Sequence, residues 1–231
     1  MSRWQIISAL GESVFLMPCA VFLYGWLRRN KDTAAARHWL GSLSLAILLV
    51  LVSKLAFLGW GIGIACLNFT GFSGHAAMAA AVLPVALFLC MPERRPELAI
   101  TGAALGGLMA VAVAVSRLKL HAHSTSEVAG GLALGYCVSL SFVLRGTTVR
   151  GSLTALLRLA ALVVLSSVPA IFAQGLTHAW LEATAMHLSG HDRPYRRGEW
   201  GMSVLDMAAP PRGSAPAALP GMPASGEHGS R

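Results

Sequence analysis

The sequence predicts an all-α membrane protein, a polytopic bundle of about six transmembrane helices. Apolar residues make up 55% of the chain and charged residues 12%, about half the charged share of a soluble domain. The mean hydropathy is +0.62. Apolar stretches, several close to the roughly 20 residues that cross hydrocarbon, lie at 6–27, 39–59, 76–91, 99–115, 128–144 and 158–174.

The chain divides by composition into three parts. Residues 1–175 hold the apolar stretches, and glycine and alanine crowd two of them, which lets helices approach closely in lipid. We expect one packed bundle there, and the first stretch should be kept as a helix because it lacks a signal-peptide cleavage site. Residues 176–207 are expected to form an interfacial helix or cap. Residues 208–231 are rich in Pro, Ala, Gly and Ser, which predicts disorder.

The net charge of +8 does not indicate a nucleic-acid partner, because the basic residues lie in short connectors and form no single stripe. The four cysteines have no spacing suited to zinc or to a disulfide framework. Basic connectors are retained on the cytoplasmic side of a membrane. The basic residues of the first, third and fifth connectors are Arg28, Arg29, Lys31, Arg37, Arg94, Arg95, Arg145 and Arg150.

This alternation places the second connector (60–73) and the fourth (116–127) outside, together with both termini. We expect the inner membrane of a bacterium, with these two connectors facing the periplasm. The fourth connector breaks the charge rule with Arg117 and Lys119. Binding an anion is one reason for such an exception.

The two outward connectors also carry His75, His121 and His123. A single histidine near a helix end is most simply an interfacial residue, but several beside an arginine favour a site. Gly71, Ser73 and Gly74 precede an apolar helix, whose free N–H groups and dipole suit phosphate oxygens.

The fourth connector begins with Ser116 and Arg117 and continues to His123 and Glu127. This spacing resembles the SRxxxxxHxxxD signature of the type 2 phosphatidic acid phosphatase superfamily, with Glu in place of Asp. In that superfamily the signature follows a PSGH motif, which is similar to Phe-Ser-Gly-His at 72–75.

The resemblance implies a lipid phosphate phosphatase that needs no metal or other cofactor. His123 would attack phosphorus to give a phosphohistidine. Glu127 would fix the tautomer of that imidazole, and His75 would protonate the departing oxygen and then activate water. The groups implied to hold the phosphate are Arg117, Ser73 and the amides around Gly74.

The first motif of the superfamily, KxxxxxxRP, is incomplete here. Lys54 matches its phosphate-binding lysine, but Gly61 and Ile62 occupy the positions of Arg and Pro. The alternative for Lys54 is a side chain that snorkels to the outer surface. Lys119 and His121 are candidates to replace the missing cation, or they point at water.

The sequence therefore predicts hydrolysis of a phosphomonoester or diphosphate headgroup on a membrane lipid. One alternative is a non-catalytic relative that binds lipid headgroups or acts in membrane assembly. Another is a small transporter that uses the histidines. The lipid and the oligomeric state stay open, and Glu12, near the outer end of the first helix, has no partner that the sequence assigns.

Overall fold

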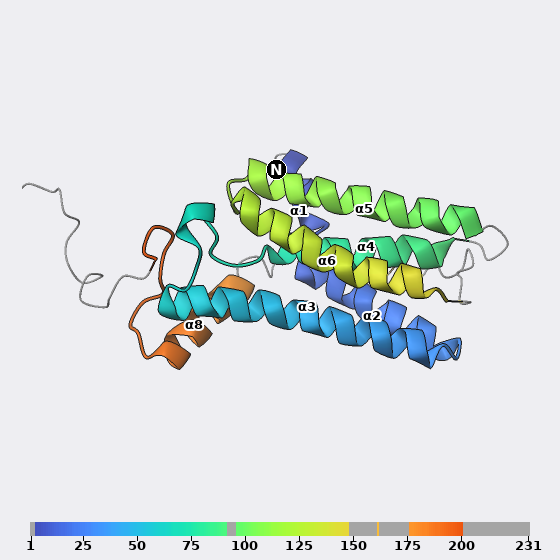
Figure 1. The fold of residues 1–231 in the computed structure, drawn as a ribbon, viewed down its shortest axis with the longest axis horizontal. Helices are drawn as coiled ribbons and strands as arrows, with labels where there is room; N and C mark the ends of the chain where they lie inside the picture. The colour runs from blue at the N-terminus through green and yellow to red at the C-terminus, as the bar shows by residue number, and fades with distance from the viewer. Residues whose placement is uncertain (1–2, 92–95, 148–160, 162–175, 201–231) are drawn as a thin grey trace, which may run out of the picture. The chain divides into compact units, whose positions relative to one another are not determined.

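The computed structural model describes residues 3–91, 96–147, 161 and 176–200, and this part of the chain is helical (Figure 1). The longer helices run roughly parallel to one another, and a short 3₁₀ turn, η1, lies in the second connector. Their bounds are α1 Arg3–Ala9, α2 Ser13–Arg29, α3 Thr33–Trp60, η1 Ala65–Leu67, α4 Gly74–Cys90, α5 Pro96–Lys119, α6 Thr125–Arg145 and α8 Leu176–Ser189.

The membrane character that the sequence predicts is confirmed by the length and hydropathy of the helices. Within the described residues, four helical stretches are long and apolar enough to cross a bilayer: Arg3–Arg29, Thr33–Trp60, Glu97–Lys119 and Thr125–Arg145. The helix α4 is apolar but shorter. The predicted helix at 158–174 and the tail at 208–231 lie outside the described residues.

The first predicted helix, 6–27, is not continuous. It divides into α1 and α2, and the break at Leu10, Gly11 and Glu12 turns the chain without a Pro. Glu12 is the residue that precedes α2, yet its side chain makes no capping hydrogen bond to that helix. The carboxylate is therefore available to another part of the fold.

The helix α4 is the centre of the bundle. It packs chiefly against α5 and α6, with α2 on another side, and most of its side chains between Ala76 and Leu89 are buried. A Cβ on Gly106 of α5 would lie 2.5 Å from the carbonyl oxygen of Leu83, and Gly135 of α6 is held equally tightly against α4. The small residues of α5 and α6 therefore act as the sequence predicts, because they allow the helix backbones to approach closely. In lipid, apolar burial gives helices little advantage in packing, so such close contacts matter more.

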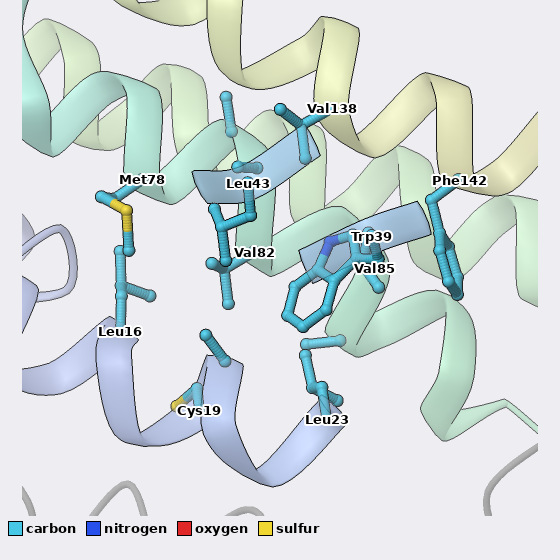
Figure 2. Close-up of a cluster of buried hydrophobic side chains, with 14 of the residues drawn as sticks. Leu16, Cys19, Leu23, Trp39, Leu43, Met78, Val82, Val85, Val138 and Phe142 are labelled. Atoms are coloured by element: carbon cyan, nitrogen blue, oxygen red, sulfur yellow. The ribbon is translucent and has the colours of Figure 1, made fainter. Parts of the chain in front are cut away.

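Larger side chains fill the core between α2, α3, α4 and α6 (Figure 2). Trp39 of α3 and Phe88 of α4 both meet the Phe142 ring edge-on, with ring centroids 6.4 Å and 6.3 Å apart. Edge-to-face rings attract through their quadrupoles. This aromatic group fixes α3, α4 and α6 near the basic end of the bundle.

The opposite end of the bundle carries the second connector and residues 120–124. The α8 helix packs beside α3, and the segment after it, residues 190–200, contacts the second connector through Tyr195 and Trp200. The two outward connectors of the sequence analysis thus lie together, as two loops flanking one helical hairpin should.

The topology can be tested with the native cysteines. Cys66 is exposed in the outer connector, whereas Cys137 lies in the middle of α6. We predict that a membrane-impermeant maleimide labels Cys66 in intact cells and leaves Cys66→Ser unlabelled. A Cys66→Ser/Asn30→Cys protein, which moves the thiol to the basic end, should react only after the membrane is permeabilised. The reverse pattern would show that the chain is inverted.

Candidate active site

A cavity of about 530 Å³ opens at the end of the bundle that carries the second and fourth connectors. Its polar part is lined by Glu12, Lys54, His75, Arg117 and His123. From there it extends between α2, α3 and α4 along apolar side chains, which include Met17, Leu43, Ile47, Val50, Leu51 and Met78. The cavity therefore joins a cluster of charged and imidazole groups to an apolar channel within the membrane-spanning helices.

His123 stands just before α6, where the sequence builds a strong helix start. Ser124 is the N-cap, and its hydroxyl oxygen accepts from the amide of Glu127 while the Glu127 carboxylate accepts from the amide of Ser124. The same carboxylate accepts from Nδ1 of His123 at 2.7 Å. This bond fixes the tautomer and leaves Nε2 of His123 as the nitrogen with a free lone pair.

Burial lowers the pKa of His123 below its ordinary value, and the Glu127 hydrogen bond opposes this shift. The cations Lys54 and Arg117 lower the pKa further. The neutral imidazole is therefore the dominant form at neutral pH. A neutral ring with one nitrogen held by a carboxylate is the form that a nucleophilic histidine requires.

Glu127 is fully buried, with 0% of its side chain exposed, so its charge must be balanced by donors. Oε1 accepts from the amide of Thr70 at 2.9 Å, from the Thr70 hydroxyl and from Arg197 Nη2 at 2.8 Å. The backbone carbonyl of Glu127 accepts from the amide of Ser73 at 3.0 Å. One residue thus ties the second connector, the fourth connector and the C-terminal segment together.

Ser73, Gly74 and His75 form the N-terminus of α4, as the sequence predicts. Gly74 and His75 line the cavity, whereas Ser73 is fully buried beside it. Within the described residues the Ser73 hydroxyl has no hydrogen-bond partner. A buried donor without a partner at a helix N-terminus is suited to binding an anionic group.

Lys54 and Arg117 approach the cavity from α3 and α5. Gly71 covers the stem of Lys54, since a Cβ on Gly71 would lie 3.1 Å from its Cγ. Arg117 donates from Nη1 to the Ser8 hydroxyl at 2.7 Å, and its buried Nε has no partner among the described residues. The other candidate cations of the sequence analysis, Lys119 and His121, do not line the cavity.

Two parts of the site were missed by the sequence analysis. Glu12 was assigned no partner, yet Oε1 lies 3.2 Å from Nε2 of His75. Arg197 was placed only in an interfacial segment, yet its guanidinium reaches Asn68 and Glu127. Both contacts join residues that are far apart in the chain, so no local sequence pattern could predict them. The one indication in the sequence was Glu12 itself, a carboxylate within an apolar stretch.

The structure also gives a reason for the incomplete first motif. Gly61 has a φ of +65°, and a Cβ there would lie 2.8 Å from the Tyr195 ring. A Cβ on Gly63 would meet Phe69 and Trp200 at similarly short distances. The C-terminal segment therefore occupies the space beside position 61, where the superfamily motif carries Arg.

Comparison with known proteins identifies the family of this chain. The model of the PAP2 superfamily matches residues 65–150. A Klebsiella pneumoniae protein described as "Uncharacterized 22.5 kDa protein in cps region" is 43% identical over 143 residues, or 61% of this chain and 68% of that protein. No solved structure matches the chain. The residues matched by the family model include His75, Arg117, His123 and Glu127.

The close contact at Gly61 predicts a stability effect. Gly61→Ala should lower the free energy of unfolding by about 1–2 kcal/mol, because an L-residue is strained at positive φ and its Cβ would also press on Tyr195. We expect the midpoint of thermal unfolding in detergent to fall by roughly 2–8 °C and trypsin to cut faster at Arg196 and Arg197.

Gly41→Ala is the matched control, since a Cβ there meets nothing within 4 Å in the middle of α3. It should leave stability unchanged or raise it. Equal midpoints for Gly61→Ala and Gly41→Ala would show that the C-terminal segment does not pack on position 61.

Proposed function

Because the chain belongs to the PAP2 superfamily, we propose that it is an integral-membrane lipid phosphate phosphatase. It would hydrolyse a phosphomonoester or diphosphate headgroup at the outer, periplasmic face of a bacterial inner membrane. The observation that carries the proposal is the His123–Glu127 pair, with its 2.7 Å hydrogen bond, opening on the same cavity as His75.

The chemistry would proceed in two displacements. Nε2 of His123 attacks phosphorus, the P–N bond forms, and the bond to the lipid oxygen breaks. His75 donates a proton to that oxygen as it departs. In the second step His75 takes a proton from water, the water oxygen attacks phosphorus, and the P–N bond breaks to release inorganic phosphate.

The phosphate would be held by charge and by α4. Lys54 and Arg117 line the cavity on separate helices and would neutralise the equatorial oxygens, where charge is concentrated in the transition state. The amides around Gly74 and the unpaired Ser73 hydroxyl would complete the cradle. Each of these groups belongs to the chain itself, so the proposed chemistry needs no metal.

The apolar part of the cavity supports a lipid as the substrate. It is lined by α2, α3 and α4, and the side chains that line it, such as Leu43, Ile47 and Met78, suit a hydrocarbon chain. A lipid could place its phosphate among the cations while its chain stays within the membrane. A water-soluble phosphate ester would make no use of this channel.

The incomplete first motif favours a second candidate. A relative that binds lipid headgroups without turnover could dispense with the motif arginine that Gly61 replaces. Such a protein would need the groups that hold the phosphate, but it would not need the hydrogen bond between His123 and Glu127. The retained hydrogen bond between these two residues favours catalysis.

The direct test is phosphate release by the purified protein from a panel of lipids. The panel contains undecaprenyl diphosphate, phosphatidylglycerol phosphate, phosphatidic acid and a lipid A phosphate, with His123→Asn as the blank. We predict release from at least one lipid that persists in excess EDTA. Binding without release would favour the second candidate, and loss in EDTA restored by a divalent ion would indicate a metallophosphatase.

The Glu127 carboxylate predicts a sharper result. Glu127→Gln should lower the rate by roughly 10²–10⁴, by analogy with loss of the orienting acid in hydrolase triads. Glu127→Asp keeps the charge and should retain substantial activity. Rates are measured per folded, detergent-extracted molecule, with Glu97→Gln as a charge-removing control at the far end of α5.

A Glu127 that served only as a helix cap would behave differently. Removing its charge would then lower stability and leave turnover per folded molecule unchanged. Parental turnover in Glu127→Gln would remove this residue from the catalytic group.

A further inference from the structure

The break between α1 and α2 packs closely against His75. A Cβ added to Gly11 would lie 2.5 Å from a methyl group of Val113 and 3.2 Å from Cβ of His75, so only glycine fits without a shift. The next residue, Glu12, places Oε1 3.2 Å from Nε2 of His75. The close packing of the backbone at Gly11 therefore brings the Glu12 carboxylate to His75.

The same short segment also reaches the phosphate-binding arginine. Ser8, at the end of α1, is buried and accepts from Arg117 at 2.7 Å. Residues 8–12 therefore contact both His75 and Arg117, although they lie before the part of the chain that the family model matches, which is 65–150. Nothing in the superfamily motifs assigns a role to this segment.

Two cations share the cavity with His75. They are Lys54 of α3 and Arg117 of α5, and the imidazoles of His123 and His178 also line it. Among the described side chains that line it, Glu12 is the only carboxylate, since Glu127 is buried behind His123. A general acid must carry a proton before it can donate one, and these cations oppose a proton on His75.

We infer that Glu12 is the positioning residue of the general acid: its carboxylate favours a proton on the His75 imidazole and fixes the orientation of the ring towards the leaving group. The inference rests on the proposed function. Nε2 of His75 lies 3.2 Å from Glu12 Oε1, so Nδ1 would be the nitrogen that donates to the departing oxygen.

The proton balance follows from this geometry. As His123 forms its bond to phosphorus and the lipid oxygen leaves, Nδ1–H of His75 transfers its proton to that oxygen. The ring then stays neutral beside the Glu12 carboxylate, which raises its basicity. Water next gives a proton back to Nδ1 while its oxygen attacks phosphorus, and the His75–Glu12 ion pair is restored.

A purely structural role for Glu12 makes different predictions. The residue precedes α2 but makes no side-chain hydrogen bond to that helix, so it is not a conventional N-cap. If it merely filled space or steadied α2, its loss would affect all substrates alike. A role through the proton on His75 would depend on pH and on the leaving group.

The first measurement needs no turnover. The pH at which half of the His75 imidazole is protonated is followed by NMR of histidine-labelled protein, with His75→Asn to assign the signal. A carboxylate favours the imidazolium, so Glu12→Gln should move this midpoint to lower pH by about one unit or more. Glu12→Asp should restore most of the shift, and Glu97→Gln should cause none.

The second measurement compares leaving groups. With an alkyl lipid phosphate, Glu12→Gln should lower kcat/KM by about 10²-fold and move the alkaline fall of the pH–rate profile to lower pH. With p-nitrophenyl phosphate, whose leaving group departs without a proton, the initial burst of nitrophenol should change little.

An unchanged midpoint in Glu12→Gln, or equal losses on the two substrates, would overturn the inference. Failure of the proposed function has a different signature: parental protein would release no more phosphate than His123→Asn. In that case the NMR midpoint still decides whether Glu12 controls the charge of His75.

Discussion

One end of the helical bundle is organised around one buried carboxylate. Glu127 is fully shielded from solvent, and an uncompensated charge in that position would cost several kcal/mol. Thr70, His123, Ser124 and Arg197 all supply donors to it. Because these donors come from separate parts of the chain, satisfying this charge also fixes the second connector, the start of α6 and the C-terminal segment relative to one another.

The structure offers an explanation for the arginine that the first motif lacks. A glycine at position 61 adopts a left-handed conformation and lets Tyr195 pack against the backbone. The segment that carries Tyr195 also brings Arg197 to Glu127. The first motif lacks its arginine, a cation that would face the phosphate. Another cation, Arg197, instead donates to Glu127, the acid that orients His123. The departure from the motif therefore accompanies the packing of the C-terminal segment at this end of the bundle.

The site is assembled by helix packing more than by its loops. Gly106 and Gly135 let α5 and α6 pack closely against α4. This packing places the N-termini of α4 and α6 next to one another. The break after α1 then fits into the same end of the bundle through Gly11. In lipid, where apolar burial gives little preference for one arrangement, such close backbone contacts decide the geometry.

Hydropathy, helix caps and motif spacing are local properties of the chain. They were enough to predict the membrane class, four of the helical stretches as continuous helices, and the grouping of His75, Arg117, His123 and Glu127. Lys54 was predicted as a phosphate-binding residue, and the structure places it at the cavity. The break at Gly11, the approach of Glu12 to His75 and the reach of Arg197 to Glu127 were decided only in three dimensions. A carboxylate finds its partner through packing across many residues, and no local pattern encodes which donor will be nearest.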